Sequence, residues 1–399
     1  MRFSDKTKYL TKSRSLSLLS RVEELKSSGK KIVNFGSRPD APSDAKNTVA
    51  TFLASGVASN YTSTRGLPVL REAIAKKLLN ENQLTIDPDK EVVVAVGAKQ
   101  GIYAALLALV DNGDEVLIED PGWLGFPSIV NLAGATPIPV PVHESNNFHI
   151  NVDDIRKRIT SRTRALLLCN PHNPTGAVLN RSELAAIGNL AHEHDFSIVV
   201  DEAYDSLIYD DHTHVSLATL DGMWERTITV QTCSKVYNMG GWRVGWIIGS
   251  ADAMSRIEAI QSSVISCPTS FAQAGVATAL SRSIGMGDEP IDQLLIRLAR
   301  QREALTDGLR KIPGITCVQP SGGFFAFPNF SSFGLTSSAL SEHLLEDAGV
   351  ITVPGDAFGH NGEGHLRILF TAPKADIVTG LDILTNSLSK ALRRSSTAN

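Results

Sequence analysis

Short apolar runs alternate with amphipathic stretches along the chain up to Glu289. The runs are rich in β-branched residues and end at glycine, proline or polar residues, which is typical of strands. Two intervening stretches, "GAKQGIYAALLALV" and "RSELAAIGNLAHEHD", are apolar at helical spacing. Alternating strands and helices predict a mostly parallel sheet covered by helices. We expect seven strands, at residues 91–96, 115–120, 136–142, 164–170, 196–204, 227–235 and 242–249.

The pattern changes at Pro290, where a long amphipathic stretch begins. It is followed by two strand-like runs, "GGFFAFPNF" and "HLRILFTAP", and by a terminal helix. A chain of 399 residues also exceeds what a single hydrophobic core usually supports. We therefore expect a second, smaller α+β domain after the large α/β domain.

Composition excludes several classes of protein. The hydrophobic share of 42% and charged share of 20% are those of a globular protein, and no apolar run is long enough to cross a bilayer. A net charge of −4 leaves no excess of positive charge for a nucleic-acid backbone. We expect neither a membrane nor a nucleic acid as partner.

Cysteine usage and the N-terminus bear on the cellular compartment. Cys169, Cys233, Cys267 and Cys317 are far apart, with no CxxC pair, which favours reduced thiols over a zinc site or disulfides. The start of the chain is basic and rich in serine, as organelle transit peptides are, but it lacks the apolar core of a secretory signal. Export is therefore not expected.

Ligands of open α/β sheets bind beyond the carboxyl ends of the strands, so the residues after each run are the candidates for a site. Gly97, Ala98 and Lys99 follow the first run and open a helix, where free N–H groups suit a phosphate. An ordinary strand-to-helix turn is the alternative. Neither GxGxxG nor GxxxxGK[ST] occurs, so a nucleotide is not the expected ligand.

Further polar and aromatic residues follow the other runs. Trp123 comes after the second run, Asn173 lies in the tight "NPHNPTG" loop after the fourth, and Asp201 and Tyr204 belong to "DEAY" at the end of the fifth. Taken singly, each has a structural explanation, such as a core tryptophan or a carboxylate that caps a helix. Their order along one sheet edge is the informative feature.

Lys235 ends the sixth run, between the hydroxyls of Thr232 and Ser234 and the guanidinium of Arg243. A lysine beside apolar sequence usually lays its stem on hydrophobic surface. A partly desolvated lysine can instead attack a carbonyl and form a Schiff base. A phosphate cradle, a ring for stacking, a carboxylate and this amine together describe a pocket for pyridoxal 5'-phosphate (PLP).

These motifs resemble those of the class I/II aminotransferases of the aspartate aminotransferase fold, which is PLP-dependent transferase fold type I. The resemblance runs from about Leu10 to Leu392 and rests on motifs in family order: "NFGSRPDAP", "YTSTRGLPVLREAI", "GAKQGIYAALLAL", "GDEVLIEDPGW", "NPHNPTG", "DEAY", "SKVYNMGGWRVG", "PGDAFG" and "LRILF". It implies a three-layer αβα large domain with a mostly parallel seven-stranded sheet, plus a smaller α+β domain. The implied division is an N-terminal arm with part of the small domain at 1–48, a large PLP-binding domain at 49–289 and a C-terminal small domain at 290–399.

The resemblance also implies roles for the catalytic residues. Lys235 would form the Schiff base with PLP and then move the substrate's Cα proton. Asp201 would pair with the pyridinium nitrogen. Tyr204 and Asn173 would hydrogen-bond the 3'-oxygen of the cofactor. Lys235, Asp201 and Tyr204 are thus the expected catalytic residues.

The remaining expected contacts concern the cofactor's ring faces and phosphate and the substrate. Trp123 and Ala203 would lie on the two faces of the ring, and Tyr61 would reach the phosphate in the neighbouring subunit of a homodimer. The residues expected around the phosphate within one subunit are Gly97, Ala98, Lys99, Thr232, Ser234 and Arg243. Arg367 would grip the substrate carboxylate as a fork. The expected substrate-binding residues are Arg367, Ser37, Asn173 and Trp123.

The chain departs from the family pattern at a few places near the substrate. Ser37 replaces a substrate-contacting glycine, and Gly240 stands where threonine is usual before "GWR". Arg38 and Arg65 could each help to bind an acidic side chain, although an exposed arginine is the commoner outcome. The stretch "RSLSLLSRVEELKSSGKKIVNFG" resembles the family's N-terminal helix, which leaves little room for a presequence and favours a cytoplasmic protein.

The expected activity is transfer of the amino group of an L-amino acid to a 2-oxo acid by a ping-pong mechanism, as in amino acid metabolism and biosynthesis. No metal is expected. Another fold type I enzyme, such as a β-lyase, a side-chain replacement enzyme, a decarboxylase, a racemase or an oxidase, would use the same lysine, aspartate and phosphate groups. A sensor fused to a DNA-binding domain is disfavoured, since only about thirty residues precede "IVNFG" and they contain no basic helix-turn-helix.

Overall fold

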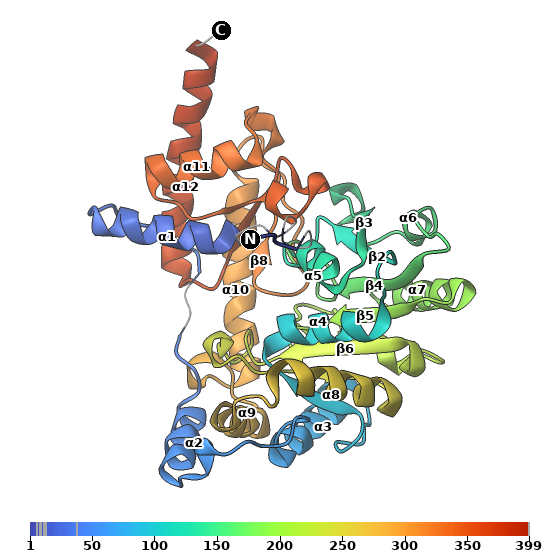
Figure 1. Ribbon diagram of the computed structural model, residues 1–399. Helices are drawn as coiled ribbons and strands as arrows, with labels where there is room; N and C mark the ends of the chain where they lie inside the picture. The colour runs from blue at the N-terminus through green and yellow to red at the C-terminus, as the bar shows by residue number, and fades with distance from the viewer. Residues whose placement is uncertain (5–6, 8–9, 11–13, 37–38, 398–399) are drawn as a thin grey trace.

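A computed structural model describes residues 1–4, 7, 10, 14–36 and 39–397. A seven-stranded sheet forms its centre (Figure 1). The strand order is β1-β7-β6-β5-β4-β2-β3, and every pairing is parallel except those of β7 with β1 and β6. The strands are β1 (Val92–Ala95), β2 (Glu115–Asp120), β3 (Thr136–Pro141), β4 (Thr163–Cys169), β5 (Ser197–Asp201), β6 (Thr227–Thr232) and β7 (Gly245–Ile248). Each overlaps one of the seven predicted runs, so the mostly parallel sheet is confirmed.

Alternate residues of a central strand show why the sheet is buried on both faces. In β4, Ala165 and Leu167 belong to the core cluster that includes Ile102 of helix α4 (Gly97–Leu109). Leu166, between them, belongs to the other cluster, which includes Leu184 of helix α7 (Arg181–His194). Successive side chains of a strand point to opposite faces, so the two clusters lie on opposite sides of the sheet. The predicted three-layer αβα arrangement follows.

The outermost strand β3 contains proline at every second position, at Pro137, Pro139 and Pro141. Proline cannot donate a hydrogen bond and is tolerated only where one side of a strand is unpaired. Accordingly, β3 pairs with β2 alone and forms an edge of the sheet.

Further helices surround this sheet, and α2 packs against α9, which also contacts α3. The α-helices are α2 (Ser43–Ala54), α3 (Pro68–Asn82), α5 (Phe126–Ala133), α6 (Val152–Arg156), α8 (Ala251–Ile265) and α9 (Ser270–Arg282). The 3-10 helices over this part of the chain are η2 (Val57–Ser59), η3 (Glu144–Asn146), η4 (Leu217–Thr219), η5 (Trp224–Arg226), η6 (Gly240–Trp242) and η7 (Met286–Asp288).

The chain after Pro290 forms a second lobe around a small antiparallel sheet with the order β8-β10-β9. Its elements are α10 (Ile291–Arg310), β8 (Phe325–Ala326), η8 (Ser331–Phe333), α11 (Ser337–Ala348), β9 (Val353–Pro354), η9 (Gly355–Phe358), η10 (His360–Gly362), β10 (Leu366–Leu369) and α12 (Lys374–Thr397). Strands β8 and β10 lie in the predicted runs, whereas the two-residue β9 is too short for a sequence pattern to show.

Helix α1 (Arg14–Ser27) joins this second lobe, because Val22 and Leu25 pack in one cluster with Leu345 of α11. The Val33–Val350 bridge adds a backbone link between the same regions. An N-terminal contribution to the small lobe is thus observed, while the domain boundaries after 48 and after 289 stay predictions.

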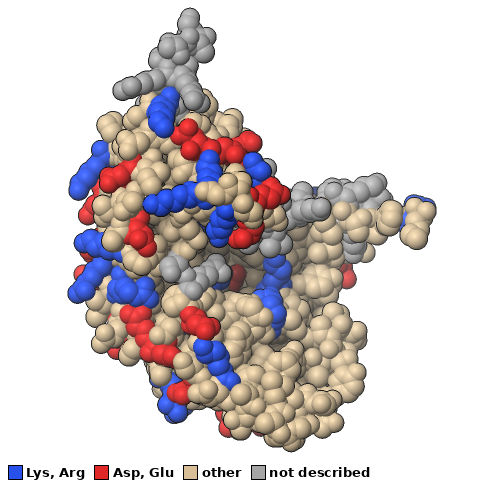
Figure 2. Space-filling model, turned by 90° about the vertical axis from the view of Figure 1, so that its left-hand side faces the viewer, with Lys and Arg blue, Asp and Glu red and all other residues tan. Residues whose placement is uncertain are grey.

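Within the described part of the chain, no helix is both long and apolar enough to cross a membrane. Figure 2 shows acidic and basic side chains interspersed over the upper and left-hand parts of one face, and a lower right-hand part with few charges. Helix α2 lies at that lower end of the molecule (Figure 1).

Candidate active site

The start of α4 forms a backbone cradle against Arg243. Gly97 has a φ of 74°, and a Cβ built on it would lie 2.5 Å from Nη2 of Arg243. Arg243 donates from Nη1 to the carbonyl of Gly240 at 2.9 Å and from Nη2 to that of Val96 at 3.3 Å. Since only glycine allows both this φ and this approach, the guanidinium is held beside the free N–H groups that begin the helix. The arrangement suits an anion.

The expected phosphate-binding hydroxyls lie at the end of the neighbouring strand β6. The hydroxyl oxygens of Thr232 and Ser234 are 2.8 Å apart, and Thr232 also donates to the carbonyl of Val244 at 3.0 Å. Val244 directly follows Arg243, so these bonds tie the hydroxyl pair to the arginine. Ala98 and Lys99 are the second and third residues of α4, and the Lys99 ammonium lies 5.1 Å from the centre of the Trp123 ring.

Asp201 is the last residue of β5 and is only 7% exposed. Burial raises the pKa of its carboxyl to about 6, although an N–H bond from Ala203 at 3.1 Å and the charge of Lys235 both oppose that rise. The nearby Glu202 carboxylate adds to it. The positive charge already present therefore offsets only part of the cost of burying this carboxylate.

Lys235 lies beside Tyr204, the aromatic residue of the "DEAY" segment. Its Nζ is 5.4 Å from the centre of the Tyr204 ring. Tyr204 is buried and meets the rings of Phe324 and Phe325 edge to face, at centroid distances of 5.5 and 5.1 Å. These contacts fix the ring, so that the phenol and the lysine share one side of the sheet edge.

Arg367 comes to this edge from the small lobe, on β10. Its Nη1 donates to Oδ1 of Asn173 at 3.1 Å. The guanidinium also lies 4.9 Å from the centre of the Phe358 ring and 5.8 Å from that of Phe325. The two lobes therefore meet at the predicted site, with a cation between aromatic rings and the "NPHNPTG" loop.

One predicted site residue, Tyr61, makes no contact with this edge among the contacts described above, and another lies outside the described residues. Tyr61 follows η2, and its side chain is 87% exposed. Ser37 lies outside the described residues, as does Arg38. Arg65 is not an exposed arginine, because its side chain is mostly buried and its Nε donates to Oε2 of Glu258 at 3.0 Å. This ion pair explains Arg65 as a structural residue.

Sequence reasoning missed a buried carboxyl and histidine beside the site, Glu119 and His172. Burial raises the pKa of Glu119 to about 8 and lowers that of His172 to about 3. The available signal for Glu119 was an acid that directly follows the three apolar residues of the strand run "EVLIED". His172 carried none beyond its place in the loop.

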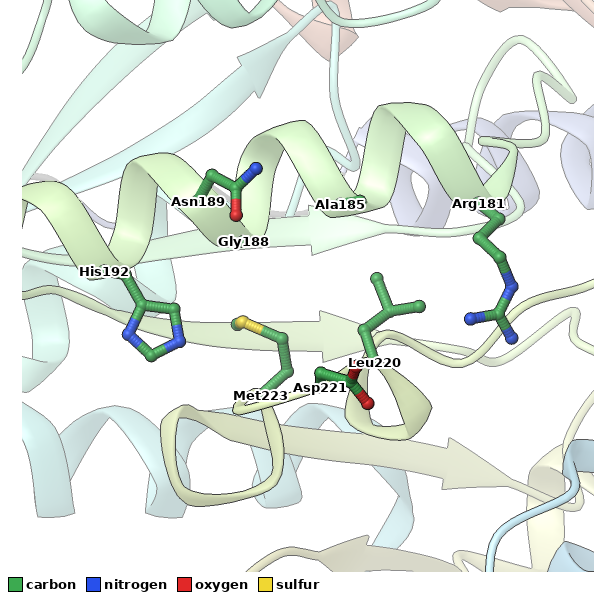
Figure 3. A pocket seen from close by; sticks show the side chains of 8 residues that line it. All are labelled: Arg181, Ala185, Gly188, Asn189, His192, Leu220, Asp221 and Met223. Carbon is green, nitrogen blue, oxygen red and sulfur yellow. The ribbon is translucent and has the colours of Figure 1, made fainter.

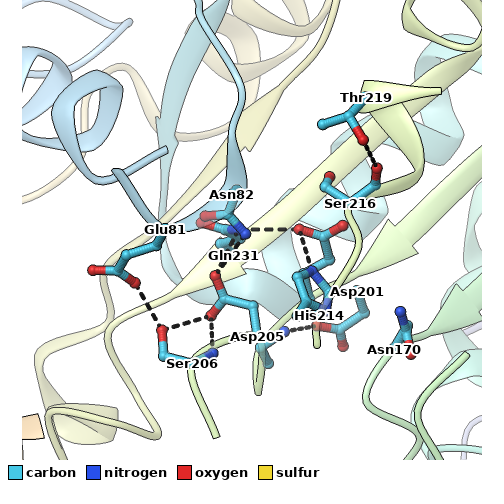
Figure 4. A network of polar contacts seen from close by, with 12 residues as sticks. Glu81, Asn82, Asn170, Asp201, Asp205, Ser206, His214, Ser216, Thr219 and Gln231 are labelled. Carbon is cyan, nitrogen blue, oxygen red and sulfur yellow. Dashed lines mark hydrogen bonds and ion pairs between the residues drawn. The ribbon is translucent and has the colours of Figure 1, made fainter. Parts of the chain in front are cut away.

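A second missed group lies behind the "DEAY" segment, where polar side chains from α3, β6 and the segment after β5 form a buried network (Figure 4). Lys77 binds Asp205 at 2.6 Å between Nζ and Oδ2, and Gln231 donates from Nε2 to both Asp205 and Glu202, at 3.0 and 3.1 Å. The Nε2 of His214 lies 3.4 Å from Oε2 of Glu202. The network braces the segment that carries Asp201 and Tyr204.

Two other hollows of the surface are lined by none of the predicted site residues. One of about 280 Å³ lies between α7 and the chain around Leu220 and Met223 (Figure 3). Another, of about 580 Å³, lies between α10 and α12. Among the residues that the structure describes, no cluster of histidine, cysteine, aspartate and glutamate could hold a metal ion.

Comparison with known proteins agrees with this arrangement. The family model "Aminotransferase class I and II" matches residues 33–384. An aspartate aminotransferase of Pyrococcus abyssi is 38% identical over 86% of this chain and 87% of its own, and a probable aspartate/prephenate aminotransferase of Aquifex aeolicus is 33% identical over 97% and 98%. The solved aspartate aminotransferase from Thermus thermophilus with maleate superposes with a TM-score of 0.89 at 31% identity, covering 97% of this chain and 100% of the other. This chain therefore belongs to the class I and II aminotransferases.

Proposed function

We propose that this aminotransferase holds PLP at the carboxyl edge of the large sheet, bound covalently to Lys235. The class I and II family is PLP-dependent. The observation that carries the proposal is Asp201, a buried carboxylate whose burial is only partly offset, on the same edge as the Lys235 amine and the Gly97–Arg243 cradle. A protonated pyridine nitrogen is the charge that this carboxylate lacks.

The residues present fit the cofactor's phosphate. The cradle between Gly97 and Arg243 offers backbone donors and a guanidinium, and the hydroxyls of Thr232 and Ser234 are tied to it through the carbonyl of Val244. Charge-assisted bonds of this kind are the stronger class of hydrogen bond. We assign the phosphate to this cradle, together with the N–H groups of Ala98 and Lys99.

The ring and its substituents fit the rest of the edge. Asp201 would pair with the ring nitrogen, Asn173 and Tyr204 would donate to the 3'-oxygen, and Trp123 and Ala203 would lie on the two ring faces. Asn173 already accepts from Arg367 through its Oδ1, which leaves its amide hydrogens for the cofactor.

The chain's own residues would orient the substrate and move its proton. PLP supplies the electron sink and carries the amino group between the two halves of the reaction. Arg367 binds the substrate carboxylate through its fork, and the rings of Phe325 and Phe358 restrict where that fork points. The Lys235 amine would take the proton from the substrate's Cα and hold it for transfer to the cofactor carbon that keeps the amino group. The amino group thus passes from an L-amino acid to a 2-oxo acid in two half-reactions.

A second copy of the chain would complete the site. Tyr61 is highly exposed, and the neighbouring α2 and η2 expose Leu53 and Val57 as well. Exposed apolar side chains gathered in one region are typical of an interface. In a homodimer, Tyr61 would donate to the phosphate of the partner's cofactor. Tyr61→Phe should weaken cofactor retention by about 1.5–3 kcal/mol, and a fully active monomer at micromolar concentration would contradict the shared site.

We also infer a cytoplasmic location. All four cysteines are free, and three of them are buried. Thiols kept reduced in this way are the rule in the cytoplasm.

A single half-reaction tests the proposed activity. Holoenzyme is mixed with each amino acid in turn, without oxygen and without an acceptor, and the cofactor form and the organic product are identified. The proposal requires pyridoxamine phosphate and one equivalent of 2-oxo acid per site, followed by recovery of the starting form when a 2-oxo acid is added. Release of ammonia, carbon dioxide or a side-chain fragment without pyridoxamine phosphate would instead indicate another fold type I reaction.

A further inference from the structure

Glu119 occupies an unusual place at the carboxyl end of β2. Its side chain is 4% exposed, in a strand whose other residues are also buried. The register between β2 and β4 ends at Ile118 and Leu167. Beyond that point, the N–H of Cys169 donates to Oε2 of Glu119 at 2.9 Å. The carboxyl thus takes over as the acceptor where the pairing of the two strands stops.

Cys169 is the residue from which the site loop departs. In the sheet it pairs with Asp201 on β5, and the N–H of the next residue, Asn170, donates to the Asp201 carbonyl at 3.0 Å. The loop then runs through Asn173, which receives the Arg367 bond. A contact that fixes Cys169 therefore fixes the relative position of the expected ring-nitrogen partner and the expected 3'-oxygen partner.

The charged and titratable groups around Glu119 come from three elements. Asp201 on β5 is close enough for its negative charge to oppose ionisation of Glu119. His172, in the loop, has its Nε2 3.8 Å from Oε2 of Glu119, while its Nδ1 is 2.7 Å from the Thr175 hydroxyl. Lys235 faces Asp201. The local positive charge thus acts on Asp201, and burial leaves both Glu119 and His172 neutral near pH 7.

We propose that Glu119 is a positioning residue for the cofactor: a neutral carboxyl that anchors the loop at Cys169 and leaves Asp201 as the carboxylate that faces the ring nitrogen. This inference rests on the proposed PLP site. Two carboxyls that share a buried region cannot both ionise without a large cost, so the one without a cation nearby keeps its proton. Glu119 then acts on the cofactor through Cys169 and Asp201 rather than by touching it.

Two substitutions separate the anchoring role from the charge. Glu119→Gln keeps a neutral acceptor for the Cys169 N–H, whereas Glu119→Leu removes the acceptor. Glu115→Gln is the matched control, because Glu115 is a buried acid on the same strand that binds Thr160 and Arg162 instead. Holoenzyme of each variant is titrated by the absorbance of the lysine-bound cofactor, and cofactor retention is measured by dialysis.

Glu119→Gln should match the wild type up to about pH 7, since it replaces one neutral group with another. Above the Glu119 pKa of about 8, the wild type gains a negative charge at Glu119, and this charge stabilises the protonated form of the lysine-bound cofactor. The cofactor should therefore stay protonated to higher pH in the wild type than in Glu119→Gln. Glu119→Leu should retain the cofactor about tenfold less tightly, as expected for the loss of one buried bond. Glu115→Gln should change neither readout.

Three results would overturn the inference. Glu119→Gln curves that coincide with the wild type at every pH would show that Glu119 does not act on the site. A shift to lower pH already below pH 7 would show that Glu119 is ionised, and unchanged retention in Glu119→Leu would remove the anchoring role. If the wild type forms no lysine-bound cofactor at all, the proposed function fails instead.

Discussion

The buried acids on the two sides of the segment from Asp201 to Asp205 differ in how far nearby cations compensate their charge. We call the side that faces Lys77 the back and the side that faces Lys235 the front. On the back, Asp205 has the Lys77 ammonium at 2.6 Å, and Glu202 has His214 at 3.4 Å (Figure 4). The pKa of Asp205 is accordingly lowered despite complete burial, because Lys77 and His214 outweigh that burial. On the front, burial dominates and raises the pKa of Asp201 to about 6.

This difference indicates on which side of the segment a ligand would bind. On the back, side chains of the protein itself provide the cations that compensate the buried acids. On the front, the protein provides less positive charge for Asp201 than burial of its carboxylate requires. The front instead offers a lysine, an arginine-lined cradle and a carboxylate whose compensation is incomplete. Strongly perturbed groups in such a place indicate a functional site, and the proposed occupant beside Asp201 is a cationic ring nitrogen.

Removal of the Lys235 amine on the front side should have the greatest effect on turnover. Lys235→Ala should lower turnover by about 10³-fold or more, because it removes both the covalent attachment and the group that moves the Cα proton. The protein should stay folded and still hold PLP non-covalently, as judged by circular dichroism and by equilibrium dialysis. Turnover within tenfold of the wild type would rule out Lys235 as the proton carrier.

Breaking the back side should unfold the protein rather than stop the chemistry. Lys77→Met leaves Asp205 as a buried charge without its main cation and should cost about 3–5 kcal/mol of unfolding free energy. Lys76→Met on the same helix is the control, because Lys76 is exposed and its loss should cost less than about 0.5 kcal/mol. Urea unfolding of the two variants gives the comparison, and equal costs would mean that Lys77 does not compensate the network.

The incomplete compensation of Asp201 should also be visible in how the stability of the apoprotein depends on pH. Since the pKa of Asp201 is raised from 3.8 to about 6, its contribution to stability is present below about pH 4 and is lost as the pH rises through 6. The full change corresponds to about 3 kcal/mol. Asp201→Asn should remove this loss, whereas Asp252→Asn, at an exposed ion pair, should not. Urea midpoints measured across this range would show parallel curves for wild type and Asp201→Asn if the carboxylate is in fact well compensated.

The smallest of these effects concerns geometry at constant charge. Arg367→Lys keeps a positive charge but loses the fork that binds a carboxylate through two parallel bonds. We expect kcat/KM to fall by roughly 10- to 100-fold, the value of one charge-assisted hydrogen bond. Arg300→Lys, on the exposed face of α10, should leave the rate unchanged. Equal rates in both variants would place the substrate carboxylate elsewhere.

The front side of this comparison was largely predictable from sequence, and the back side was not. Asp201, Asn173, Thr232 and Lys235 follow apolar runs directly, and the ends of parallel strands meet at one edge, so chain order alone brings them together. The fold followed from the same alternation of strands and helices.

The back network had no such signal, because Lys77 on α3 is distant in sequence from Asp205, and His214 lies in a loop without a motif that links it to Glu202. A lysine in an amphipathic helix is ordinarily exposed, and only the tertiary packing buries this one. Glu119 was hidden for a related reason: its effect depends on where the β2 register ends, which a sequence pattern does not specify. The Arg65–Glu258 ion pair was likewise not predictable, because it forms between residues far apart in the sequence.

Reductive trapping shows whether PLP binds on the front side of the Asp201 segment, where the buried carboxylate is incompletely compensated. Purified protein is incubated with PLP, reduced with borohydride, digested and mapped by mass spectrometry, with Lys77→Met treated in parallel. We expect a single phosphopyridoxyl adduct, on Lys235, in both proteins. An unmodified Lys235 peptide, or an adduct spread over surface lysines, would contradict it.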